Sequence, residues 1–228
     1  MDLRKATPYI LIIQLVLVVI LLLQMNAISG SLAEITGDVV IDGDSDGIGD
    51  TGGSADTITD INIDGDPYMG ANPNDAKVVI VEFSDFQCPY CQRGAEVIAE
   101  IMADYGDEVS LVFKDFPLSF HQYAQTAAEA AECAHEQDMF WEYHDMLFAN
   151  QDSISPEFLT TAAEQIGLDV DDFTSCMDSG ATTSEVRTDY GHGVSAGVRG
   201  TPGFFINGEL VSGAQPYETF EAAILQYL

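Results

Sequence analysis

Hydrophobic and polar positions divide the chain into three parts. Within residues 1–28, a long apolar run follows two basic residues. Residues 29–75 are polar and contain acidic residues but no Lys or Arg. From 76 to 228, apolar residues recur at the spacings of strands and helices. This third part therefore predicts a folded domain, and its length suits a single one.

The domain alternates between strand-like and helix-like patterns. In order, the expected elements are a strand at 78–83, a helix at 92–104, a strand at 109–113, helical periodicity at 121–150, helices at 155–167, 173–177 and 184–196, strands at 204–206 and 209–211, and a helix at 218–227. Asn207–Gly208, between the last two strands, is the strongest short-range signal for a hairpin. The mixture of strands and helices predicts an α/β fold.

The apolar segment predicts either a transmembrane anchor or a cleaved signal peptide. From Tyr9 to Ile28 it would extend about 30 Å as a helix, which is enough to span a bilayer. Arg4 and Lys5 favour a cytoplasmic N-terminus, so a single-pass protein of the cell membrane would hold its domain on the extracytoplasmic side. The alternative is cleavage near Ala27–Ser29, where small residues have suitable spacing. Both alternatives predict export.

Charge narrows the range of partners. The chain has 38 acidic and 7 basic residues, a net charge of −31, which argues against nucleic acid as a partner. This excess of acidic residues is typical of proteins adapted to high salt, but it also occurs in acidic proteins from an ordinary habitat. Like charges and few apolar residues predict that 29–75 is a disordered linker. Inside it, Asp42–Asp50 matches the start of a calcium loop, but Gly53 stands where the loop needs Glu. Weak calcium binding and a plain solvated linker are both open.

The sequence Cys88-Pro89-Tyr90-Cys91 joins the first strand to the first helix. Two cysteines with this spacing at a strand-to-helix junction are typical of a redox dithiol. At a helix N-terminus, unpaired N–H groups and the helix dipole stabilise the Cys88 thiolate, the form that attacks disulfides. Pro89 suits the first helical turn, because the N–H that it lacks would have no partner there.

Residues 77–228 resemble the DsbA-like family of exported thiol-disulfide oxidoreductases. The matching segments are Glu82–Phe86 before the dithiol, Lys114–Leu118, Gly200–Gly203 and Asn207–Gly208. The resemblance implies an α/β, thioredoxin-like fold with an inserted α-helical domain at about 119–197. It also implies an enzyme without a cofactor or metal that introduces or exchanges disulfide bonds in exported proteins.

The resemblance assigns roles to individual residues. Cys88 would form the mixed disulfide with the substrate, and Cys91 would resolve it. Pro202 would be a cis proline facing the dithiol, and the backbone of Thr201 would bind the substrate as an added strand. Glu82, six residues before Cys88, would be a buried acid that accepts the proton of Cys91. The alternative for Glu82 is an outward-facing strand residue.

The dipeptide Pro89–Tyr90 tunes the reduction potential, because it affects the stability of the reduced form. Strongly oxidising members of the family carry His at the position of Tyr90, so this departure argues against an extreme oxidising potential. Cys133 and Cys176 would form either a structural disulfide, as in some relatives, or a second redox pair. His121 is expected to cap or pack a helix.

We expect a disulfide donor that is recharged by a quinone-linked membrane partner. Exported isomerases of the family add a dimerisation domain, and 30–75 is too short and polar for one, so we expect a monomer. A reductase or isomerase kept reduced by a membrane partner is the first alternative. A module that binds Cu(I) through Cys88 and Cys91 is the second, and a redox-inactive interaction domain is the third.

Overall fold

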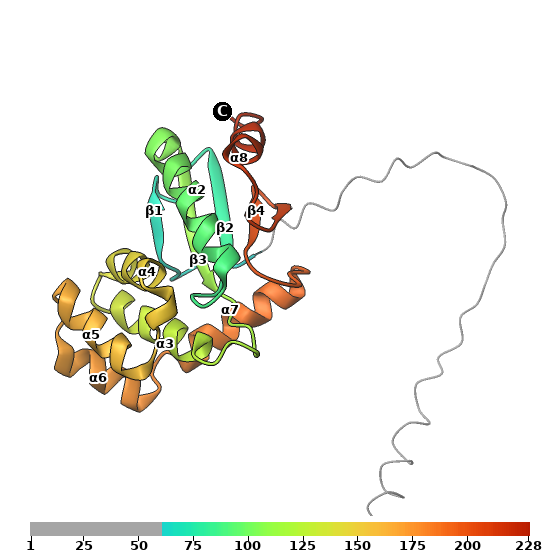
Figure 1. The fold of residues 1–228 in the computed structure, drawn as a ribbon. Coiled ribbons are helices and arrows are strands. Elements are labelled where there is room, and N and C mark those ends of the chain that lie inside the picture. Colours follow the sequence, from blue (N-terminus) through green and yellow to red (C-terminus); the bar gives the residue numbers. More distant parts are fainter. Residues whose placement is uncertain (1–60) are drawn as a thin grey trace, which may run out of the picture. The chain divides into compact units, whose positions relative to one another are not determined.

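The computed structural model describes residues 61–228 (Figure 1). Its elements are β1 (Tyr68–Gly70), β2 (Val78–Ser84), α2 (Pro89–Tyr105), β3 (Val109–Asp115), α3 (Ala124–His135), α4 (Phe140–Ala149), the 3₁₀ turn η2 (Gln151–Ser153), α5 (Pro156–Ile166), α6 (Val170–Ser179), α7 (Thr183–Ser195), β4 (Gly203–Ile206), β5 (Glu209–Ser212) and α8 (Tyr217–Ile224). The predicted anchor, most of the predicted linker and the Asp42–Asp50 motif lie outside the described residues. None of the helices within 61–228 is long and apolar enough to cross a membrane.

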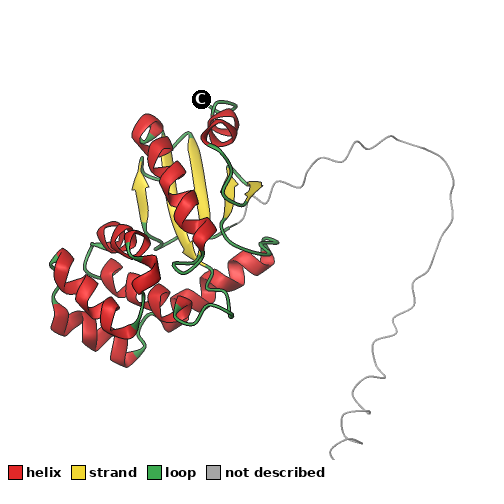
Figure 2. Ribbon diagram, in the orientation of Figure 1, coloured by secondary structure: helices red, strands yellow, loops and turns green. Residues whose placement is uncertain are grey.

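The strands form one sheet in the order β1-β3-β2-β4-β5. β2 and β3 are parallel, whereas every other neighbouring pair is antiparallel. Parallel neighbours need a crossover connection, and α2 supplies it by lying across the strands (Figure 2). The carboxyl end of β2 therefore meets the N-terminus of α2 in the turn that holds the dithiol.

The two faces of β2 pack against different layers, as the two-residue period of a strand requires. Ile80 is buried in one core with Ile98 of α2. Phe83, three residues later, is buried in another core with Val198, which follows α7. Glu82 has the same parity as Ile80 and therefore lies on the α2 side of the sheet.

The helices α3 to α7 lie between β3 and β4, inside the interval for which an α-helical insertion is expected. The helical pattern at 121–150 divides into α3 and α4. Asp138, between the two helices, has a φ of 59°, which an α-helix does not allow. Leu147, Leu159 and Phe173 are buried together, so α4, α5 and α6 share a core.

Local sequence signals account for several boundaries. Ser155 accepts a hydrogen bond from the N–H of Phe158 and caps α5, and Gly167 ends that helix with a φ of 91°. Asn207 and Gly208 have φ values of 45° and 88°, so both adopt the left-handed conformation of a type I′ hairpin turn. The predicted helix at 155–167 and the predicted hairpin at Asn207–Gly208 are therefore confirmed. Helix α2 begins at Pro89, earlier than the apolar pattern indicated.

The folded part of the chain begins before residue 76. Strand β1 pairs with β3, with Tyr68 opposite Val112. Asp66 is 7% exposed, and its Oδ2 lies 2.6 Å from Nζ of Lys114. The prediction of a disordered linker through residue 75 is therefore wrong for this stretch. A buried lysine pairs with an acid that the sequence does not distinguish from its acidic neighbours.

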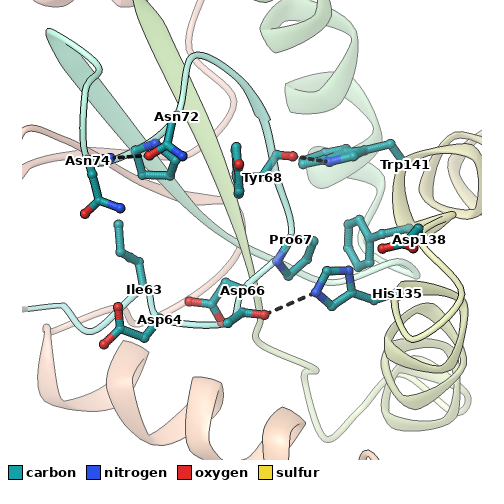
Figure 3. Close-up of a pocket in the computed structure, with 13 residues that line it drawn as sticks. Ile63, Asp64, Asp66, Pro67, Tyr68, Asn72, Asn74, His135, Asp138 and Trp141 are labelled. Carbon is teal, nitrogen blue, oxygen red and sulfur yellow. Dashed lines mark hydrogen bonds between the residues drawn. The ribbon is translucent and has the colours of Figure 1, made fainter.

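The segment around β1 also contacts the helical layer (Figure 3). His135 donates from Nε2 to the carbonyl oxygen of Gly65 at 3.1 Å, and the indole N–H of Trp141 donates to the carbonyl oxygen of Tyr68 at 2.9 Å. These side chains line a cavity of about 430 Å³. Neither cysteine of the dithiol lines it, so it is separate from the candidate active site.

A disulfide joins α3 to α6 through Cys133 and Cys176, whose Cα atoms are 5.9 Å apart. Cys133 is 1% exposed and Cys176 is 9% exposed. We expect this bridge to stay closed under mild reduction that opens Cys88–Cys91, because neither of its cysteines is at a helix N-terminus, where a thiolate is stabilised. Alkylation of free thiols in graded thiol–disulfide buffers, read by mass spectrometry, measures both pairs. The same titration in urea is the control, and labelling of all four thiols together in the folded protein would contradict a protected bridge.

Candidate active site

The dithiol is at the start of α2. Cys88 is the N-cap residue with an extended backbone, and Pro89 occupies the first helical turn. Cys88 is 4% exposed and Cys91 is 0% exposed, whereas Tyr90 between them is 56% exposed and carries the guanidinium of Arg93 over its ring. The two sulfur atoms are therefore unequal, because only Cys88 has any exposure to solvent.

The pKa values of the two thiols are unequal as well, and they too distinguish Cys88 from Cys91. The Cys91 thiol, followed by Thr201 and the backbone of the first turn, stabilises the Cys88 thiolate and lowers the pKa of Cys88 to about 5. Burial, and the neighbouring Cys88, raise the pKa of Cys91 well above its ordinary value. At neutral pH, Cys88 is therefore the nucleophile and Cys91 retains its proton.

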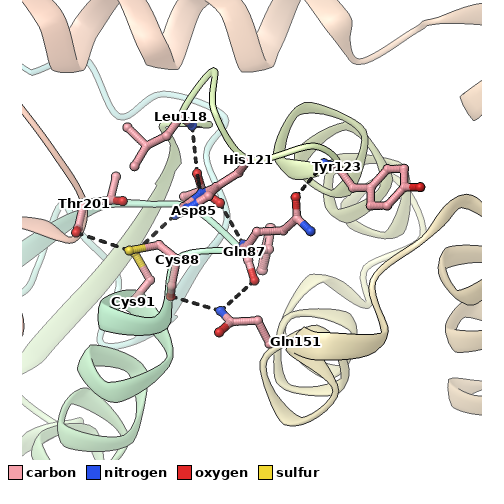
Figure 4. A network of polar contacts seen from close by, with 10 residues as sticks. Asp85, Gln87, Cys88, Cys91, Leu118, His121, Tyr123, Gln151 and Thr201 are labelled. Carbon is pink, nitrogen blue, oxygen red and sulfur yellow. Dashed lines mark hydrogen bonds and ion pairs between the residues drawn. The ribbon is translucent and has the colours of Figure 1, made fainter.

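The loop before β4 faces the dithiol. The Thr201–Pro202 peptide bond is cis, as predicted. Cys88 Sγ lies 3.5 Å from the carbonyl oxygen of Thr201 (Figure 4). Gly200, Thr201 and Pro202 line a cavity of about 450 Å³ next to Arg199. Backbone groups of this loop are thus placed beside Cys88, where the prediction puts a bound substrate segment.

Glu82 is buried on the side of the sheet that α2 covers. It is 1% exposed, so the alternative of an outward-facing residue is wrong. Its Oε1 has no hydrogen-bond partner among the described residues. Burial raises the pKa of Glu82 to about 7, and the neighbouring Ser84 opposes that rise. A carboxyl group with this pKa can both accept and donate a proton near neutral pH.

Asp85 holds the turn before the dithiol, a role that the sequence does not indicate. Its N–H donates to Cys91 Sγ at 3.4 Å, and its Oδ1 accepts the N–H of Gln87 at 2.7 Å. Its Oδ2 accepts the N–H of Leu118 at 2.7 Å and lies 2.8 Å from Nδ1 of His121 (Figure 4). His121, expected to cap or pack a helix, is thus paired with an acid beside the site. The available signal was an acidic residue three positions before Cys88.

The inserted helices also fix this turn. The Gln151 side chain donates to the carbonyl oxygens of Phe86 at 2.8 Å and Cys88 at 3.0 Å. Gln87 accepts the N–H of Tyr123 at 2.5 Å. The turn that carries Cys88 is therefore held from the sheet by Asp85 and from the helical insertion by Gln151.

The family model described as Thioredoxin matches residues 63–226. The chain belongs to the thioredoxin family. BdbD from Bacillus subtilis is 25% identical with a TM-score of 0.65, over 73% of this chain and 94% of that one. A thioredoxin-like oxidoreductase from Silicibacter pomeroyi is 25% identical with a TM-score of 0.63, over 76% and 97%. Alpha-DsbA2 from Wolbachia pipientis, named a thiol-disulfide exchange protein, is 22% identical with a TM-score of 0.64, over 71% and 86%, and shares the fold.

Curated relatives extend the comparison. Na(+)/H(+) antiporter NhaA 3 of Salinispora tropica is 37% identical over 179 residues, which are 78% of this chain and 27% of that protein. NhaA of Herminiimonas arsenicoxydans is 34% identical over 152 residues, 67% of this chain and 24% of that protein. The chain thus spans about a quarter of the length of the curated relatives that it matches.

The prediction of a thioredoxin-like fold of the DsbA-like type is therefore confirmed. Cys88 and Cys91 are not bonded to each other in the structure. Within 61–228, one group of acidic side chains has metal-ligand spacing, and it comprises Asp66, Glu185 and Asp189 without either cysteine.

Proposed function

We propose that this protein donates disulfide bonds to exported proteins that contain cysteines. The observation that carries the proposal is the inequality of the two thiols: the pKa of Cys88 is lowered to about 5, while that of Cys91 is raised. A dithiol whose reduced form is stabilised as a thiolate gives up its disulfide readily, so it acts as an oxidant. Tyr90 at the position of the family's His moderates this effect.

Donation has two exchange steps. A substrate thiolate attacks Cys88 Sγ of the oxidised protein, the Cys88–Cys91 bond breaks, and Cys91 leaves as a thiolate that takes up a proton. Glu82 is the buried group that supplies this proton. A second substrate thiolate then attacks the substrate sulfur bound to Cys88, so the substrate disulfide forms and the Cys88 thiolate leaves. Two electrons then reside in the dithiol.

The place of action and the partners are part of the same proposal. The chain would be a monomer anchored in the cell membrane by residues 1–28, with its domain on the extracytoplasmic side. A quinone-linked membrane partner would take the two electrons and restore the disulfide. The similarity to proteins named Na(+)/H(+) antiporters supports a position beside a membrane for this type of domain.

The reduction potential of Cys88–Cys91, equilibrated against glutathione at high and low salt, tests the proposal. A value near about −120 mV supports disulfide donation. A value near about −270 mV, typical of thioredoxin, favours the alternative of a reductase or isomerase kept reduced by a membrane partner. Mass spectrometry after Cu(I) loading addresses the metal-handling alternative, which predicts a stable adduct that is absent from the Cys88→Ala variant.

A further inference from the structure

Ser84 lies between Glu82 and the resolving cysteine. Along β2, Ile80, Glu82 and Ser84 have the same parity, so their side chains face α2. Ile80 packs with Ile98 in the middle of α2, and each later member of the row is nearer to the N-terminus of that helix. A strand rises about 3.3 Å per residue, so Ser84 is about 7 Å closer than Glu82 to the end that carries Cys91.

Several contacts bring Ser84 close to both Glu82 and Cys91. The N–H of Asp85, the residue after Ser84, donates to Cys91 Sγ at 3.4 Å, which places the thiol beside Ser84. By strand parity and chain position the Ser84 side chain lies between Glu82 and Cys91, and its hydroxyl group lowers the pKa of both. Glu82 and Ser84 are each 1% exposed. Bulk water therefore does not connect the carboxyl group with the thiol.

Two atoms in this row lack hydrogen-bond partners within the described part of the chain. They are Oγ of Ser84 and Oε1 of Glu82. A buried hydroxyl group without a hydrogen-bond partner lowers the stability of the fold. A hydroxyl group is both a donor and an acceptor, so it can pass a proton when its two neighbours change charge. The unpartnered Ser84 hydroxyl is free to turn toward either neighbour.

We propose that the Ser84 hydroxyl relays the proton between Cys91 and Glu82 during thiol–disulfide exchange. The inference rests on the exchange activity of Cys88–Cys91 described above. When Cys91 resolves a mixed disulfide, its proton passes to Ser84 Oγ while the Ser84 hydroxyl proton passes to the Glu82 carboxylate. The Cys91 sulfur then attacks Cys88 Sγ, the bond from Cys88 to the substrate breaks, and the substrate leaves as a thiolate. In disulfide donation the same proton travels in the opposite direction.

Other polar and titratable groups face this path. Cys88 is the N-cap of α2, three residues before Cys91, and Thr201 lies in the loop before β4, where it lowers the pKa of Cys91. Asp115 of β3 lies opposite Ser84 in the parallel register and is 1% exposed. Burial, then Glu132, raises the pKa of Asp115 well above its ordinary value. Asp115 is therefore the rival proton acceptor, and the Asp115→Asn variant below separates it from Glu82.

The test measures the two steps of exchange separately. The reduced full-length protein is mixed with oxidised glutathione, and rapid quenching with mass spectrometry follows first the Cys88–glutathione disulfide and then its resolution by Cys91. In Ser84→Ala, resolution is expected to slow by about 10²-fold at neutral pH, the scale of general acid–base catalysis. The first step is expected to be unchanged. The dependence of the resolution rate on a group titrating at about pH 7 should disappear as well.

Four variants serve as controls. Ser110→Ala removes another fully buried, unpartnered hydroxyl group from the same sheet, at a position opposite Val79 and far along β2 from the dithiol, and should resolve at the wild-type rate. Ser84→Thr keeps a hydroxyl group and should restore the rate and the pH profile. Glu82→Gln should slow resolution, and adding Ser84→Ala to it should cause no further loss, because both act on one proton. Asp115→Asn should leave the pH profile in place.

The relay is overturned if Ser84→Ala resolves at the wild-type rate with the wild-type pH profile. It is overturned as well if the losses of Ser84→Ala and Glu82→Gln multiply, or if the pH dependence disappears in Asp115→Asn instead. Failure of the exchange activity has a different signature. In that case the wild-type protein itself forms no Cys88–glutathione disulfide.

Discussion

The Cys88→Ala variant is expected to lose thiol–disulfide exchange completely, whereas Cys91→Ala is expected to accumulate mixed disulfides with its substrates. Cys88 has the lowered pKa, lies at the helix N-cap and is the cysteine with some exposure. Cys91 is 0% exposed and keeps its proton, so it cannot replace Cys88 in the attack on a substrate. Without Cys91 the first covalent bond still forms, but no intramolecular thiol removes it. Intact mass spectrometry after incubation with a disulfide-containing peptide measures both outcomes.

The matched control is the double variant Cys133→Ala and Cys176→Ala. It removes both sulfur atoms of the pair in the insertion and should retain full exchange activity, while it loses about 2–4 kcal/mol of stability. The assigned order of attack is wrong if Cys88→Ala forms the adducts and Cys91→Ala does not. Loss of exchange in the control double variant, with its fold intact, would instead assign a redox role to the second pair.

The dithiol and the proline loop could be predicted from the sequence because their properties depend on short segments. Cys88–Cys91 follows an apolar strand and opens a helix, so its position at a helix N-terminus follows from local pattern. Asn207–Gly208 specifies its turn through the backbone preferences of two residues. The cis bond before Pro202 was expected from resemblance and is present.

The groups that hold the dithiol could not be predicted in this way. Asp85 binds the N–H of Leu118, 33 residues away, and Gln151 binds the carbonyl oxygen of Phe86, 65 residues away. Such pairs depend on how the insertion packs against the sheet, which periodicity does not describe. Ser84 looked like a polar residue at the end of a strand. Its importance depends on two neighbours, Glu82 and Cys91, that come from different elements.

The boundary of the folded domain was misplaced for a related reason. Strand β1 has three residues, too few for a two-residue period to stand out, and it lies in an acidic segment. Asp66 has many acidic neighbours in sequence, yet it is the one that meets Lys114 of β3. The difference between a solvated acid and a buried one is made by its partner, which is distant along the chain.

The Lys114→Met variant is expected to lose about 3–5 kcal/mol of unfolding free energy, because it leaves buried carboxylates without their cation. Lys114 is 1% exposed, and its Nζ lies 2.6 Å from Oδ2 of Asp66 and 2.6 Å from Oδ1 of Asp189. Burial alone would lower the pKa of Lys114, but the two aspartates outweigh it and raise the pKa. Asp189 also accepts the N–H of Asp115 at 3.0 Å, so the lysine supports the end of β3 as well. Urea unfolding of the variant and the wild-type protein measures the loss.

The unfolding free energy lost in Lys114→Met should increase as the pH rises. Burial, followed by Asp189, already raises the pKa of Asp66 to about 7 although Lys114 opposes this rise. Without the lysine that pKa rises further above the unfolded-state value, so the folded variant binds more protons than the unfolded chain near neutral pH. Its stability then falls as the pH rises through the folded-state pKa, and the loss is expected to be smaller at about pH 5 than at about pH 8.

Lys77→Met is the matched control, because it makes the same substitution at an exposed ion pair. Lys77 and Glu108 are 53% and 45% exposed, and an exposed pair contributes less than about 1 kcal/mol. A loss in Lys114→Met no larger than that of Lys77→Met would contradict a stabilising buried cluster. A loss that grew as the pH fell would contradict the assignment of the uncompensated charge to Asp66. The expected pattern is a large, pH-dependent loss at Lys114 beside a small one at Lys77, because burial determines the cost of removing a charge partner.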